Sequence, residues 1–329
     1  MPKLNRTVIH IGMPKTGSTA IQNTLAINRE SLYALDIYYP VSATRGNAHH
    51  PLAWAASLHR KPRVDIAPLP ETFESLSREL GGKEGSAVLS SEALFHLPRQ
   101  ELKLIFEWSA EIADSTIVVV YVRAPAAHHE GWYKQLVKTS GYALTFDEHL
   151  REATVINTAS RLLAAEELLG RHRLNVRPYL PNAFRDRDVV NDFCEVVGID
   201  SRQLHPIQHS HTNPSLDVEL VEFKTRLHRS GVEHSHRLAN ALLEWTKRRE
   251  PSRRSLFTPA SWEEFIGATE REHLAVISRY HLPSALIDQR PEDFTQTPLS
   301  EERLLELLEQ FEAEFPVVAR ECLSPILLP

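Results

Sequence analysis

The chain has 329 residues, with 37 basic and 43 acidic side chains and a formal net charge of −6 at pH 7. This acidic balance excludes a basic nucleic-acid binder, and a composition of 42% hydrophobic and 24% charged residues is typical of a globular protein with a large core rather than of a disordered chain. Two cysteines cannot form a disulfide framework, and Met1 to Arg6 lacks the apolar stretch of a signal peptide, so we expect a cytoplasmic protein without a transmembrane segment.

The first predicted element is a short buried strand that leads into a glycine turn. Thr7 to Ile11 (TVIHI) is rich in β-branched residues and stops at Gly12. A helix from about Ser18 to Arg29 follows, because its apolar residues fall on one face. This order brings backbone N–H groups and a helix N-terminus to one point, and such a point attracts phosphate.

The next segment, Tyr33 to Pro70, carries five prolines. Prolines disfavour long regular elements, except around Leu52 to Leu58 where none occurs. We therefore expect a lid or a substrate-facing insertion at about residues 33–70.

Three further strands alternate with helices along the chain. The strands are predicted at Ala87–Ser90, Thr116–Val122 and Leu174–Tyr179, and the helices at Arg99–Ala110 and Ser160–Leu169. This alternation, with long connections, predicts an α/β fold in which a parallel β-sheet is flanked by helices. Ligands of such folds bind beyond the carboxyl ends of the strands.

From Asn213 onward the pattern is helical. Leu216 to Leu227 and Leu304 to Phe311 carry leucine stripes at helical spacing. We expect two parts, in which residues 1–212 form the α/β core and residues 213–329 form a helical C-terminal part packed on it.

The turn from Gly12 to Thr19 has the sequence GMPKTGST. An ordinary P-loop for nucleotide triphosphates, GxxxxGK[ST], places its lysine directly before Ser or Thr, whereas Lys15 comes earlier in this turn. The turn resembles the 5′-phosphosulfate loop of the sulfotransferase family, P-K-[TS]-G-[TS]-[TS]. The resemblance implies a P-loop-like fold and 3′-phosphoadenosine-5′-phosphosulfate (PAPS) as the donor, without a metal.

The same resemblance assigns roles to the residues of the turn. Lys15 would bind the donor and stabilise the charge that develops on the bridging oxygen as the sulfuryl group leaves. The 5′-phosphate would be held by the residues that follow it, Thr16, Gly17, Ser18 and Thr19.

A second match lies at the end of the predicted strand Thr116–Val122. Family members place an arginine there and a serine eight positions later, and both bind the 3′-phosphate of the donor. Arg123 occupies the arginine position, and Trp132 to Gln135 (WYKQ) continues as in similar bacterial members. The chain departs from the family pattern in two ways, because Gly131 stands at the serine position and the late RKGxxG motif is absent. The resemblance thus assigns Arg123 to the 3′-phosphate and leaves its hydroxyl partner unassigned.

Sulfuryl transfer needs a base within hydrogen-bond reach of the proton on the acceptor hydroxyl or amine. Glu92 is the first candidate, because it follows the strand Ala87–Ser90 at about the place where cytosolic sulfotransferases carry their catalytic histidine. His49 and His50 come next, since they lie in the loop-rich segment, and His96 is the weakest candidate. Each of these residues has an alternative as an ordinary surface or hydrogen-bonded side chain.

The acceptor is less specified than the donor. A carbohydrate hydroxyl is the first expectation by family analogy, and small alcohols, lipids and amines stay open, as does the oligomeric state. The basic residues Lys247, Arg248 and Arg249 could receive an anionic acceptor, although such clusters are more often solvated. His209 and His211 lack the further ligands that a zinc site needs.

Two other functions stay open. A P-loop-type nucleotide-dependent kinase is disfavoured by the position of Lys15 and because the strand Thr116–Val122 is followed by arginine where a kinase would carry an acid. A non-catalytic nucleotide-binding protein is compatible with Gly131 and with the open choice of base.

Overall fold

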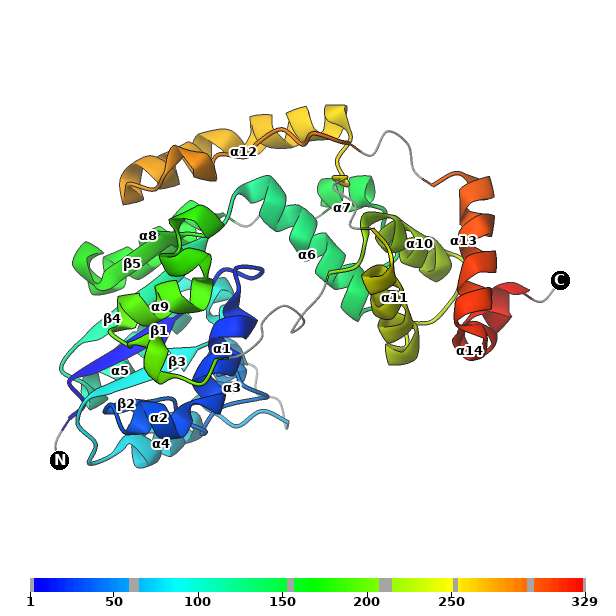
Figure 1. Cartoon of the computed structure of the whole chain (residues 1–329). Helices are drawn as coiled ribbons and strands as arrows, with labels where there is room; N and C mark the ends of the chain where they lie inside the picture. The colour runs from blue at the N-terminus through cyan, green and yellow to red at the C-terminus, as the bar shows by residue number, and fades with distance from the viewer. Residues whose placement is uncertain are drawn as a thin grey trace. The chain divides into compact units, whose positions relative to one another are not determined.

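The computed structural model describes residues 3–58, 65–152, 157–206, 215–250, 254–294 and 299–327. The chain forms two compact units, whose elements are labelled in Figure 1. Unit 1 comprises Met1–Ala124, Asn157–Thr212 and Glu272–Ile287, and unit 2 comprises Pro125–Ile156, Asn213–Arg271 and Asp288–Pro329.

This division differs from the two-part organisation that we expected. One boundary between the units lies between residues 212 and 213, as we expected. Residues 125–156, however, belong to the helical unit, and residues 272–287 belong to the α/β unit. The reason is long-range packing. Tyr133 and Phe146 lie in one hydrophobic core with Phe223, whereas Arg279 forms an ion pair with Glu166 of unit 1 at 2.7 Å.

Unit 1 is built on a parallel five-stranded sheet, as the alternation of strands and helices predicted. The strands lie in the order β2-β3-β1-β4-β5, and every neighbouring pair is parallel. Their bounds are β1 (Arg6–His10), β2 (Ile37–Tyr38), β3 (Ser86–Ser90), β4 (Thr116–Val122) and β5 (Leu174–Pro178). The chain adds β2 and β3 on one side of β1 and β4 and β5 on the other. The carboxyl end of β1 is therefore the topological switch point at which open α/β sheets bind ligands.

The helices are divided between the two units. Those of unit 1 are α1 (Ser18–Ile27), α2 (Arg29–Tyr33), α3 (His50–Leu58), α4 (Leu69–Leu80), α5 (Arg99–Ile112), α8 (Thr158–Leu169) and α9 (Val189–Val197). Those of unit 2 are α6 (Pro125–Thr139), α7 (Phe146–Glu152), α10 (Val218–Arg229), α11 (His236–Arg248), α13 (Glu301–Glu314) and α14 (Pro316–Leu327). The remaining long helix, α12 (Pro259–Tyr280), contributes its residues up to 271 to unit 2 and the rest to unit 1.

Helices cover both faces of the sheet in unit 1. Val8 packs in one core with Ile21 of α1 and Phe193 of α9. Thr7, which points to the opposite face because side chains alternate along a strand, forms a short hydrogen bond with Ser109 of α5. This arrangement is the α/β fold that the sequence predicted.

The proline-rich segment from residue 33 to residue 70 contributes to the sheet. Ile37 and Tyr38 pair with Ser86 and Ala87 as an edge strand, and α3 covers the stretch where a regular element was predicted. The prediction missed β2 because a two-residue strand has no periodic pattern in the sequence. Part of the expected insertion therefore belongs to the core of unit 1.

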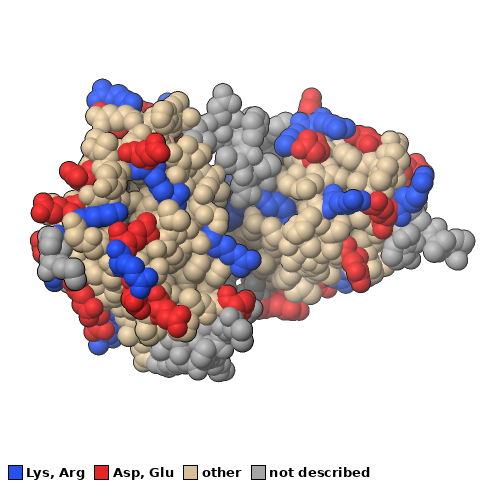
Figure 2. All heavy atoms as spheres, turned by 90° about the horizontal axis from the view of Figure 1, so that it is seen from below, with Lys and Arg blue, Asp and Glu red and all other residues tan. Residues whose placement is uncertain are grey.

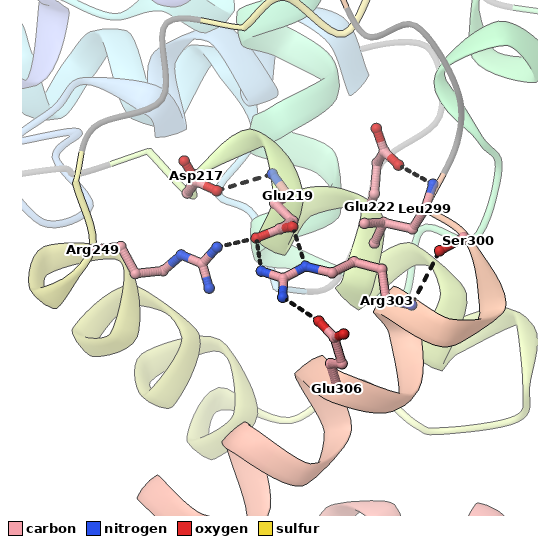
Figure 3. Close-up of polar contacts among 8 residues, drawn as sticks. All are labelled: Asp217, Glu219, Glu222, Arg249, Leu299, Ser300, Arg303 and Glu306. Atoms are coloured by element: carbon pink, nitrogen blue, oxygen red, sulfur yellow. Dashed lines mark hydrogen bonds and ion pairs between the residues drawn. The ribbon is translucent and has the colours of Figure 1, made fainter.

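Unit 2 is held together by an aromatic core and by an ion-pair network on α10. Figure 3 shows Glu219 of α10 accepting hydrogen bonds from Arg249, at the end of α11, and from Arg303 of α13. The Arg303 Nε–Glu219 Oε1 distance is 2.7 Å, and Arg303 also binds Glu306 at 2.6 Å. Burial opposes ionisation of Glu219, but the hydrogen bonds and charges of Arg303 and Arg249 lower its pKa overall. The network ties three helices together.

The basic residues at the end of α11 are paired with carboxylates. Lys247 binds Glu244 at 2.6 Å, Arg248 binds Glu314 at 3.2 Å, and Arg249 belongs to the network on Glu219. These ion pairs give the cluster a structural role, and they do not support the hypothesis that it receives an anionic acceptor.

Charge and metal-binding groups are dispersed in the described part of the molecule. On the face drawn in Figure 2, Lys and Arg side chains lie interspersed with Asp and Glu side chains. Among the described residues, no three His, Cys, Asp or Glu side chains gather as a possible metal site. None of the helices within the described ranges is long and apolar enough to cross a membrane. His209 and His211 lie outside the described residues.

Candidate active site

Residues 12–19 connect β1 to α1 at the switch point of the sheet. Gly17 caps α1 in the left-handed conformation, with φ 78°, and its carbonyl accepts a hydrogen bond from Ala20 N at 2.9 Å. A Cβ atom on Gly17 would lie 2.8 Å from Val189 Cγ1. Both the backbone conformation and the lack of space therefore require glycine here.

Lys15 and Arg123 are far apart in the sequence and adjacent in the structure. Arg123 follows β4, and its Nη1 donates a hydrogen bond to the backbone oxygen of Lys15 at 3.1 Å. Its guanidinium also lies 5.7 Å from the centre of the Tyr179 ring. Lys15 has φ 65°, and the next residue, Thr16, donates its hydroxyl to Met13 O at 2.5 Å. The loop is thus held in place by Arg123, which follows β4, and by a hydrogen bond between two of its own residues.

Two buried polar atoms beside Gly12 have unmet hydrogen-bonding capacity. Ser18 Oγ and His10 Nε2 have no hydrogen-bond partner among the described residues. A Cβ atom on Gly12 would lie 2.7 Å from Ser18 Oγ and 3.0 Å from His10 Nε2, so only a glycine lets the backbone pass this close. Buried polar atoms are usually satisfied, and each exception requires an explanation, of which a group bound beside Gly12 is one.

A phosphate group fits these residues. The first N–H groups of a helix have no partner within the helix and attract an anion. The first turn of α1 carries no acidic residue that would repel it, and Gly17 makes no side-chain cap that would compete for these N–H groups. The hydroxyl of Ser18 is a further donor at the same helix end.

Glu92 and His50 form a pair just beyond the end of β3. Glu92 Oε1 lies 3.8 Å from His50 Nε2, and both side chains are partly exposed. His50 Nδ1 lies 2.8 Å from Ser91 Oγ, which also accepts from Ala93 N. Because a carboxylate faces Nε2, we assign the imidazole proton to Nε2, and Nδ1 then accepts from the Ser91 hydroxyl. Both ring nitrogens of His50 thus face polar groups of this segment.

His49 has a structural position. It is fully buried, its Nδ1 accepts from the backbone N–H of Ser90 at 3.2 Å, and its Nε2 donates to Pro40 O at 3.1 Å. Both ring nitrogens are thus engaged by backbone groups, and no nitrogen is left to take a proton from an acceptor. This geometry therefore does not support the hypothesis that His49 is the base.

Two further residues of interest are His96 and Gly131. His96 ends the 3₁₀ turn η1 (Glu92–His96), where desolvation and the positive charge of Arg161 lower its pKa against the opposing effect of Glu92. Gly131 lies within α6 and has no side-chain hydroxyl, so the second contact of a 3′-phosphate stays unassigned.

Gln22 is a residue of the candidate site that the sequence patterns did not indicate. It is buried in α1, and its Nε2 donates to Glu92 Oε2 at 2.9 Å and to Ser90 Oγ at 3.3 Å. The available signal was its spacing, because a polar residue four positions after Ser18 lies one helical turn beyond the loop, on the same side of the helix.

The buried histidines of unit 1 predict a stability that depends on pH. Burial lowers the pKa of His10 and of His49 from 6.5 to about 4. Because folding favours the neutral imidazoles, their contribution to stability is fully present above about pH 6.5 and is lost as the pH falls through 4. We expect the free energy of unfolding in urea, followed by circular dichroism, to be lower at pH 5 than at pH 7. Equal values would contradict this, and replacing the exposed His172 with glutamine should leave the dependence unchanged.

Comparison with solved structures gives matches at low sequence identity. No protein-family model matches the chain, and no curated protein matches it. Among solved structures, a sulfotransferase from Alicyclobacillus acidocaldarius is 16% identical, with 87% of this chain and 99% of that chain covered and a TM-score of 0.45. The sulfotransferase domain from the curacin biosynthetic pathway is 12% identical, with coverages of 86% and 99% and a TM-score of 0.41. At such identities the function has to be argued from the residues of the site.

Proposed function

We propose that the chain is a sulfotransferase that uses PAPS to sulfate a hydroxyl or an amine of an acceptor. The observation that carries the proposal is the arrangement at one edge of the sheet. The loop of residues 12–19 leaves β1, and Glu92 follows the neighbouring strand β3, where His10 pairs with Ser90. An anion-binding loop with Lys15 and a partly exposed carboxylate thus leave adjacent strands in the same direction.

The chain's own residues would hold the donor and move one proton. PAPS, when bound, supplies the sulfuryl group. The loop residues Thr16 to Thr19 hold its 5′-phosphate, Arg123 binds the 3′-phosphate as a charged donor, and Lys15 stabilises the negative charge that develops on the leaving oxygen. This scheme includes no metal, because Lys15 and the loop amides provide the positive charge.

Glu92 is the proposed base. The acceptor oxygen or nitrogen forms the new bond to sulfur, the bond between sulfur and the bridging oxygen breaks, and the acceptor proton goes to the Glu92 carboxylate. His50 Nε2 lies 3.8 Å from that carboxylate, beyond hydrogen-bond distance.

The surroundings of His50 contain an aromatic ring and a cation. Trp54 stacks on His50 with ring centres 5.5 Å apart, and the guanidinium of Arg45 lies 5.4 Å from the centre of the Trp54 ring. A carbohydrate hydroxyl is the first acceptor that we propose to test.

We also propose a cytoplasmic location, since neither Cys194 nor Cys322 forms a disulfide.

The proposal is tested with the desulfated product of the donor, 3′-phosphoadenosine-5′-phosphate (PAP). At about one hundred times its dissociation constant, PAP should stabilise the native state by roughly 2.7 kcal/mol, which a thermal-shift measurement resolves. Mg-ATP and AMP are the comparison ligands. Stabilisation by Mg-ATP alone would favour the kinase, and stabilisation by PAP without transfer to any acceptor would favour a non-catalytic nucleotide-binding protein.

A further inference from the structure

A chain of hydrogen bonds joins Glu92 to the strand that carries the donor loop. The amide of Gln22, only 4% exposed, donates to Glu92 Oε2 at 2.9 Å and to Ser90 Oγ at 3.3 Å. Ser90 Oγ in turn lies 2.8 Å from Nδ1 of His10, the last residue of β1. The chain therefore runs from Glu92 through Gln22 and Ser90 to His10, directly before the loop.

The chemistry of the chain determines which atoms donate. A carboxylate only accepts, so the Gln22 group beside Glu92 is the NH₂ group, and its two protons serve Glu92 and Ser90. Ser90 Oγ accepts one of them, which leaves its own proton for His10 Nδ1. His10 then carries its proton on Nε2, the atom that lies against Gly12.

The contact fixes one oxygen of Glu92. It holds Oε2, so that Oε1 is the oxygen that lies 3.8 Å from His50. Among the described residues, Gln22 is the side chain that forms a hydrogen bond with Glu92.

We propose that Gln22 is the positioning residue for Glu92. Gln22 lies on α1, whose N-terminus forms part of the donor loop, so one rigid helix sets the distance between the bound donor and the base. This inference rests on the proposed function, because it gives Gln22 a role through the base. A displacement of about 1 Å in such a site lowers the rate about 100-fold.

The first test is Gln22→Leu, which removes both N–H groups at similar side-chain volume. We expect kcat to fall roughly 10- to 100-fold, the KM for the acceptor to change little, and stabilisation by PAP to stay as in the wild type. Turnover is measured as PAP released from PAPS, with the fastest acceptor from a panel of methyl glycosides, phenols and alkyl amines.

A double-mutant cycle separates positioning from a packing effect. In the Glu92→Gln background, Gln22→Leu should cause no further loss of kcat, because the residue it positions is already inactive. Ser90→Ala keeps the bond between Gln22 and Glu92 and should cost less than Gln22→Leu. Gln203→Leu, which changes an exposed amide of unit 1, is the matched control and should leave kcat unchanged.

The outcomes distinguish this inference from the function on which it rests. Wild-type kcat in Gln22→Leu, or the full effect of this substitution in the Glu92→Gln background, would overturn the role of Gln22 and would not affect the proposed sulfotransferase function. No stabilisation of the wild type by PAP would overturn the proposed function and the role of Gln22 with it. If Gln22→Leu does not fold, Gln22→Met tests the same contact, because its unbranched side chain follows the shape of glutamine and has no N–H donor.

Discussion

Replacing Lys15 with alanine should lower PAPS turnover at least 100-fold and leave the fold intact. The magnitude follows from removing a positive charge from the place where negative charge develops on the leaving oxygen, which costs about 10²- to 10³-fold in comparable sites. The fold should survive because Arg123 binds the backbone oxygen of Lys15, and alanine keeps that oxygen. Turnover is measured as PAP release, and folding is measured by circular dichroism.

The matched control is Lys103→Ala. Lys103 also belongs to unit 1, but it lies exposed on α5, where it pairs with Glu107 at 3.4 Å. Its replacement should leave turnover unchanged. Wild-type turnover in Lys15→Ala would refute the role of the lysine, and a loss of folding in that variant would refute the view that its side chain serves the ligand.

Replacing Asp192 with alanine should destabilise the protein by about 3 kcal/mol, or roughly 6–12 °C in the melting temperature. Asp192 is only 1% exposed, and it accepts hydrogen bonds from Tyr121 Oη at 2.7 Å and from Arg177 Nε at 3.0 Å. Its removal leaves the buried tyrosine hydroxyl and the guanidinium without their acceptor. The expected loss is at the lower end for buried pairs, because the Arg177 side chain is 33% exposed and can reach water.

Urea unfolding of two variants tests this assignment. Asp192→Asn keeps an acceptor for Tyr121 and loses the charge opposite Arg177, so its stability should lie between those of the wild type and Asp192→Ala. Asp200→Ala is the control, because Asp200 pairs with Arg202 at the surface and such pairs contribute little. Equal effects of Asp192→Ala and Asp200→Ala would show that burial of the pair does not determine its contribution.

The elements of unit 1 were predictable where their patterns are long and local. The strand at Thr116–Val122 is observed with the predicted bounds, because seven consecutive apolar or β-branched residues specify a buried strand. The predicted helix from Ser18 stops at Ile27 instead of Arg29. Asn28 ends it through a bond from its side chain to Thr24 O and a second one to His205 O. The partner at residue 205 has no signal near Asn28 in the sequence.

The candidate site was predictable in its parts and less so in its arrangement. The turn sequence pointed to Lys15 and the strand end pointed to Arg123, but nothing local indicated that the guanidinium binds the lysine carbonyl. His49 and His50 were equal candidates in the sequence. The structure separates them, since His49 has both nitrogens on backbone groups and His50 faces Glu92.

The sequence by itself determined the glycine turn between a strand and a helix, the basic residues Lys15 and Arg123 of the candidate site, and the parallel α/β sheet. These features depend on the conformational preferences of a few neighbouring residues, which any short stretch of chain carries with it. Only the tertiary structure decided that Gln22 binds Glu92, that Arg123 anchors Lys15 and that α6 and α7 pack with the helical unit. Those contacts depend on the order of the strands and on which helix faces meet, and both are decided when distant segments compete to bury their apolar surfaces together.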